Sequence, residues 1–68
     1  METQFIYIVK GVKRHFTGDC EISIVAARRE EKDAIKVGAG WARSENLWAH
    51  DQNKNIHASY VIVKLPLL

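Results

Sequence analysis

The stretch Ala26–Arg43, AARREEKDAIKVGAGWAR, is the segment of this chain whose apolar residues recur at helical spacing. At about 100° per residue, Ala27, Ala34 and Trp41 stack on one side of a helix because each follows the last after two full turns. Three further members of the same arc are Ile35, Gly38 and Ala42. We therefore predict an amphipathic helix whose small residues let it lie close to a sheet.

Some features of this segment argue against an unbroken helix. No Ser, Thr, Asp or Asn stands at the cap position before Arg28, and Gly38 and Gly40 each cost about 1 kcal/mol in a helix interior. The helix could therefore end near Val37, with Gly38 as its C-terminal cap. A strand-like alternation is also present at Ile35, Val37, Ala39 and Trp41. If that alternation dominates, the chain is an all-β small barrel instead.

The segments on either side of the predicted helix favour β-strands, because they are rich in β-branched and aromatic residues. The predicted strands are Phe5–Val12, Cys20–Ala26, a short Leu47–His50 and Ile56–Leu65. Thr17-Gly18-Asp19 is a plausible hairpin reversal, and Pro66 should end the last strand. The order β-β-α-(β)-β predicts an α+β fold, with one helix on one face of a small antiparallel sheet of three or four strands.

Length and composition limit the chain to a single domain, residues 1–68. A domain of this size is near the lower limit for an independent core, so oligomerisation or partner binding would help to stabilise it. The hydrophobic fraction of 47% argues against disorder. The net charge of +2 is compatible with nucleic-acid binding and does not require it.

The sequence also predicts where the protein is located. Cys20 is the single cysteine, so no internal disulfide can form, which fits a reducing compartment. Met1–Gln4 is polar, and the apolar run that follows is too short for a signal peptide. No run approaches the roughly 20 apolar residues that a membrane-spanning helix needs. We expect a cytoplasmic protein without membrane association.

Few side chains are candidates for catalysis or metal binding. The possible metal ligands, none at a recognised ligand spacing, are His15, Cys20, His50 and His57. The neighbour of Cys20 is Asp19, an acid, whereas a nucleophilic thiol is activated by a base or a cation. Gly38-Ala39-Gly40 lacks the spacing and the following Lys-Ser/Thr of a phosphate-binding loop. We expect no enzyme activity, no metal, no cofactor and no small-molecule substrate.

Basic side chains predict a binding surface. Opposite the apolar arc of the predicted helix gather Arg29, Lys32, Lys36 and Arg43. Lys13 and Arg14 add positive charge in the first hairpin. Such clusters can neutralise phosphates or dock on an acidic protein surface. Trp48 and Tyr60 are candidate aromatic anchors, because aromatic residues often dominate binding energy at interfaces.

One helix cannot cover both faces of the predicted sheet. The first strand is apolar on both sides, as in a central strand or an interface. Depending on the strand register, the candidates for the uncovered face are Phe5, Tyr7, Val9, Tyr60 and Ile62. We expect this face to bind a protein partner or a second copy of the chain. The alternative is a curled sheet whose second face is covered by Trp48, Leu67 and Leu68.

The run Tyr7–Val12, and Ile24-Val25-Ala26-Ala27 with the later Ala34-Ile35, resemble segments of small phage-encoded proteins. Among these are a type I-F anti-CRISPR family and phage inhibitors of host RNA polymerase. The resemblance covers about half the chain and implies a stoichiometric inhibitor that binds a host complex through charged and aromatic surface. No position-specific motif matches, so no functional residue is carried across.

Together these features predict a small non-enzymatic interaction protein, encoded by a phage or mobile element, that binds and modulates a host protein or nucleoprotein complex. The alternative is a nucleic-acid-binding module that uses the basic helix face.

Overall fold

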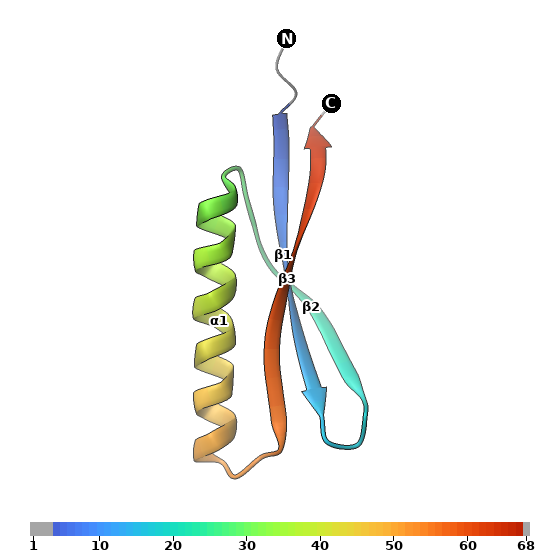
Figure 1. Cartoon of the computed structure of the whole chain (residues 1–68), viewed down its shortest axis with the longest axis vertical. Coiled ribbons are helices and arrows are strands. Elements are labelled where there is room, and N and C mark those ends of the chain that lie inside the picture. The colour runs from blue at the N-terminus through green and yellow to red at the C-terminus, as the bar shows by residue number, and fades with distance from the viewer. Residues whose placement is uncertain (1–3, 68) are drawn as a thin grey trace.

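The computed structural model describes residues 4–67, which form three strands and one helix (Figure 1). The elements are β1 (Gln4–His15), β2 (Cys20–Arg28), α1 (Glu31–Asp51) and β3 (Ile56–Leu67). The strands make one antiparallel sheet in the order β2-β1-β3, and α1 lies along one face of it. The predicted α+β class and β-β-α-β order are confirmed. The barrel alternative is wrong, because the sheet is open at both edges.

The hairpin between β1 and β2 turns where the sequence predicts a reversal. Gly18 has a positive φ of 95°, which glycine adopts without a steric penalty. The His15 backbone N–H donates to the Asp19 carbonyl at 2.9 Å, and the Gly18 N–H donates to the His15 carbonyl at 2.9 Å. The tight reversal places β2 directly beside β1.

The helix differs from the prediction at both ends. It begins at Glu31 rather than Ala26, because Ala26–Arg28 continues β2 and pairs with β1. It then runs through Gly38 and on to Asp51, so Leu47–His50 is helical and the predicted fourth strand does not form. Tertiary packing of α1 on the sheet compensates for the low helix propensity of glycine.

At the centre of the helix–sheet interface, two aromatic rings each pack against a glycine. Trp41 of α1 lies over Gly11 of β1, and Tyr60 of β3 lies against Gly38 of α1. Gly11 and Tyr60 are cross-strand partners, so the two contacts are neighbours. We call these four residues the glycine–aromatic cluster. Because neither glycine has a side chain, α1 can approach the sheet closely at this point.

The buried part of the core is small. Among the described residues, the apolar side chains that are buried are Val9, Ala34, Ala49 and Ala58. Three of these four are alanines, which contribute little apolar area each. Most of the contact between α1 and the sheet therefore comes from half-buried aromatic and aliphatic side chains.

The residues predicted for the uncovered face lie instead on the face that carries α1. Val9 is fully buried, and its register partner Ile62 and the helix-contacting Tyr60 share its side of the sheet. Alternation along β1 places Phe5 and Tyr7 on that side as well. The prediction was wrong because both faces of β1 are apolar, so the sequence could not indicate which one meets the helix. The uncovered face carries the even-numbered residues of β1.

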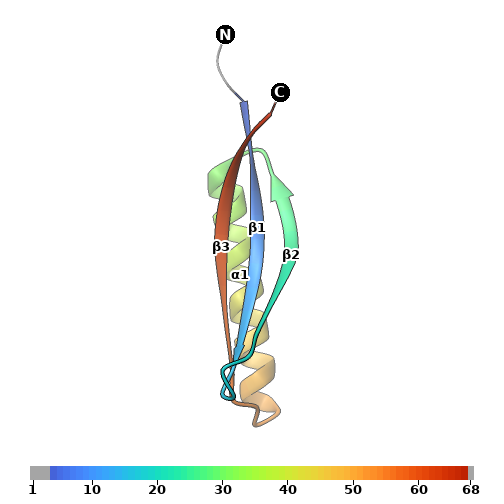
Figure 2. The ribbon, with the colours of Figure 1, turned by 90° about the vertical axis from the view of Figure 1, so that its right-hand side faces the viewer.

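The alternative covering by Trp48, Leu67 and Leu68 is not what the structure shows for the residues it describes. Trp48 belongs to α1, on the other side of the sheet, and Leu67 is the last residue of β3. Leu68 lies outside the described residues. Figure 2 shows the sheet in front, with α1 behind it.

Asn46 of α1 forms hydrogen bonds with the outer edge of β3. Its Nδ2 donates to the Ala58 carbonyl at 3.0 Å, and its Oδ1 accepts from the Ala58 N–H at 2.8 Å. The side-chain amide thus satisfies both backbone groups of an edge residue that has no neighbouring strand on that side. Further along the same edge, Pro66 lacks an N–H, which an outer edge tolerates.

We expect Asn46→Leu to lower the free energy of unfolding by about 1–3 kcal/mol, because it leaves the polar groups of Ala58 without partners at a part-buried site. The midpoint of urea unfolding measures this change. Ser44→Ala is the control, because Ser44 is an exposed residue of the same helix and should change stability by about 0.5 kcal/mol at most. Equal midpoints for the two variants would contradict the role assigned to Asn46.

Candidate binding surfaces

Three of the four predicted basic helix residues form a stripe on the side of α1 that faces away from the sheet. Lys32, Lys36 and Arg43 are all exposed and lie within about 40° of one another around the helix axis. Arg29 is exposed too, but it lies between β2 and α1 and outside the helix. The sequence alone predicts this stripe because all three positions lie within both the predicted and the observed helix.

Ion pairing leaves most of this charge available. Lys32 Nζ lies 3.6 Å from Glu30 Oε2, and both side chains are largely exposed, so the pair contributes little. Within residues 4–67, Lys36 and Arg43 make no ion pair. Their positive charges are therefore free to meet an anionic partner.

The two basic residues of the hairpin do not act together. Lys13 Nζ lies 3.2 Å from Glu45 Oε2 of α1, on the helix side of the sheet. Arg14 comes next in the strand, points to the opposite face and has His57 as its register partner. Alternation along the strand therefore places Lys13 and Arg14 on opposite faces of the sheet, although their adjacency in the sequence predicts one cluster.

The two predicted aromatic anchors have different surroundings. Trp48 is 50% exposed and borders a shallow hollow of about 390 Å³, lined also by Lys13, Ser44 and Glu45. Tyr60 is half-buried, and its ring packs against Gly38 in the glycine–aromatic cluster. Trp48 is thus accessible to a partner, whereas Tyr60 is engaged within the fold.

Sequence interpretation missed one apolar residue beside the basic stripe. Leu47 is 59% exposed and follows Arg43 by one helical turn. The sequence does not indicate this position, because Leu47–His50 also fits a short strand. We call Lys32, Lys36, Arg43 and Leu47 the outer surface of α1; Trp48 lies about 100° further around the helix axis, on the flank beside the sheet.

The second large surface is the face of the sheet opposite α1, which we call the open sheet face (Figure 2). Its aliphatic residues are Ile6, Ile8, Val12, Ile22, Ile24, Val61, Val63 and Leu65. Exposed fractions reach 73% for Ile24 and 67% for Ile22. Lys10 and Arg14 lie on the same face, and none of the strand residues described on it is acidic. The face is therefore largely apolar, and the charged strand residues on it are both basic.

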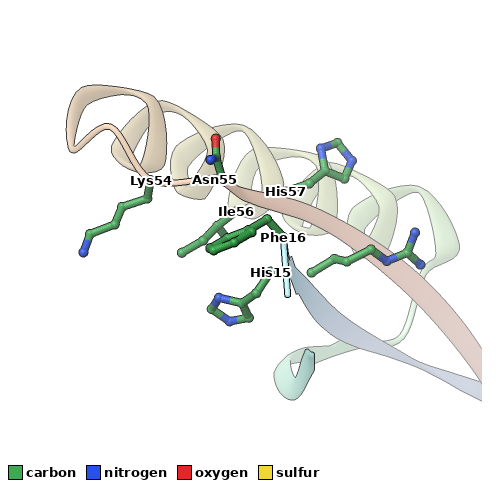
Figure 3. A pocket seen from close by; sticks show the side chains of 7 residues that line it. His15, Phe16, Lys54, Asn55, Ile56 and His57 are labelled. Carbon is green, nitrogen blue, oxygen red and sulfur yellow. The ribbon is translucent and has the colours of Figure 1, made fainter. Parts of the chain in front are cut away.

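A wide, shallow hollow lies at the hairpin end of the sheet (Figure 3). Its lining includes Phe16, 80% exposed, which projects beside Ile56. His15 also lines it, and its Nε2 lies 3.2 Å from Glu21 Oε2. The described residues contain no group of three His, Cys, Asp or Glu that could hold a metal ion. The hollow thus offers exposed apolar and basic groups without an enclosed pocket.

No polar or charged side chain of residues 4–67 is buried. In that range, no helix combines the length and the apolar character needed to cross a membrane. No protein-family model, curated protein or solved structure matches the chain.

Proposed function

We propose that the protein acts by binding a host protein or nucleoprotein complex and catalyses no reaction. The observation that carries this proposal is the outer surface of α1, where Leu47 is exposed beside the unpaired charges of Lys36 and Arg43. An exposed leucine next to free cations suits an acidic partner surface with an apolar depression. A phage or mobile-element origin, a cytoplasmic location and stoichiometric inhibition belong to the same proposal.

The charged and apolar parts of this surface would affect different steps of binding. Exposed cations at the rim speed the encounter with an acidic partner and make the rate of association depend on salt. Burial of Leu47, and of Trp48 on the adjacent flank, would slow dissociation, because buried apolar anchors contribute most of the binding energy in protein interfaces. A tryptophan of this kind contributes about 2 kcal/mol or more when it is a hot spot.

We expect Leu47→Ser combined with Trp48→Ser to abolish capture of the partner from host lysate, because both apolar anchors are removed. The matched control is Phe16→Ser, which removes an exposed apolar side chain at the hairpin, outside both surfaces. Loss of capture by Phe16→Ser and not by the α1 substitutions would move the partner site from α1 to the hairpin.

With the purified partner, Lys36→Glu should slow association at low salt and change dissociation much less, as measured by surface plasmon resonance.

A second candidate function is nucleic-acid binding through the same cations. Lys32, Lys36 and Arg43 extend along α1 for about 16 Å, a length over which a nucleic acid presents several phosphates. Titration with labelled duplex and single-stranded DNA and RNA, at low and high salt, tests it through the fluorescence anisotropy of the nucleic acid. Lys36→Ala should reduce the salt slope by about one unit. An unchanged signal at low salt excludes this candidate.

A further inference from the structure

The chain exposes more surface than a compact monomer of its mass. A 7.8 kDa monomer is expected to expose about 4,400 Å², and this chain exposes 5369 Å². Its radius of gyration is 13.9 Å, where about 11 Å is expected for 68 residues. The excess of about 1,000 Å² is close to the roughly 800 Å² that each partner buries in a standard protein interface.

We propose that a second copy of this chain covers the open sheet face, so that two sheets pack face to face with one helix on each outer side. Aliphatic side chains cover this face over most of the length of the sheet, as in the inner layer of a sandwich. Such packing would bury Ile22, Ile24 and Val61, which the monomer leaves largely exposed. The dimer would thereby supply the apolar core that the single chain lacks.

Lys10 is the residue that constrains this arrangement. It lies in the middle of the open sheet face, where its register partners are Ile24 and Val61. Consider a two-fold axis that lies between the two sheets and runs parallel to the row formed by Ile8 and Val63. The two Lys10 residues then lie on opposite sides of this axis. Each long side chain can then extend its ammonium group to the rim and bury only its aliphatic stem. Lys10 should therefore weaken the dimer without preventing it.

The composition of the face favours a second copy over a nucleic acid. No Phe, Tyr or Trp of the described strands lies on it, so it lacks the large aromatic rings on which bases stack. Self-association is favoured over a different protein because the unburied apolar area is a deficit of this chain's own core. The inference does not depend on the proposed function, since the outer surface of α1 stays exposed on both copies.

The test is sedimentation equilibrium of the full chain over a range of micromolar concentrations. We expect the wild type to dimerise, and Ile24→Thr combined with Val61→Thr to weaken the dimer by about a hundredfold or more, because hydroxyl groups would be buried. Both positions are exposed in the monomer, and threonine is a good strand former, so the monomer fold should persist. The control is Leu47→Gln on α1, which should leave the dimer unchanged.

Lys10→Met is an independent test, because it predicts a tighter dimer, which a damaged fold would not produce. Removal of the charge from the middle of the face should strengthen the dimer about tenfold, because no ammonium group has to remain hydrated at the interface. A wild type that stays monomeric at every concentration would overturn the inference. A dimer weakened by Leu47→Gln and not by the paired threonine substitutions would also overturn it, because the copies would then meet through α1.

Discussion

Replacement of Gly11 by alanine is expected to lower the free energy of unfolding by about 2–3 kcal/mol. A Cβ at this position would lie 2.5 Å from Cη2 of Trp41 and within 2.8 Å of two further atoms of its six-membered ring. Gly11 is buried in the central strand, which is hydrogen-bonded on both sides and cannot move away. The indole must therefore shift, and overpacking of this kind costs about 1–3 kcal/mol.

Thermal unfolding at a fixed protein concentration measures this effect. For a domain of this size, 2–3 kcal/mol corresponds to a fall in Tm of roughly 10–20 °C. A double-mutant cycle with Trp41→Leu supplies the control, because the smaller side chain leaves room for the new methyl group. The Gly11→Ala substitution should cost much less in the Trp41→Leu background, and equal costs in both backgrounds would refute the proposed contact.

The strands and the centre of the helix could be predicted because they depend on local patterns. β-branched runs identify β1 and β3, and the glycine of the hairpin marks the turn. The helix start was wrong because Ala26 and Ala27 fit a strand and a helix equally well. Their strand conformation depends on pairing with Val9 and Ile8 of β1, which are distant in the sequence.

The candidate surfaces were predictable to the extent that they follow from one element. Lys32, Lys36 and Arg43 share a side in any helix that contains them. The composition of the open sheet face depends on which side of β1 receives α1. Trp41 packs over Gly11 on the odd-numbered side of β1, and a contact between elements leaves no periodic signal in the sequence.

The two glycines of α1 should respond in opposite directions to the same substitution. A Cβ on Gly38 would lie 2.5 Å from Cδ2 and 2.7 Å from Cγ of Tyr60. These atoms are close to the backbone of β3, so the ring cannot easily swing away. A Cβ on Gly40 would meet no heavy atom within 4 Å beyond its chain neighbours and the backbone of its own helical turns. Only the first position therefore needs glycine for packing.

We expect Gly40→Ala to stabilise the protein by about 0.5–1 kcal/mol, because alanine has the higher helix propensity and replaces an exposed glycine. Gly38→Ala gains the same propensity but must overcome overpacking at the upper end of about 1–3 kcal/mol, so a net loss of about 2 kcal/mol is expected. Each variant is the matched control of the other in urea unfolding. If both substitutions stabilise the protein, Tyr60 does not press on Gly38, and α1 packs less closely on the sheet than the glycine–aromatic cluster implies.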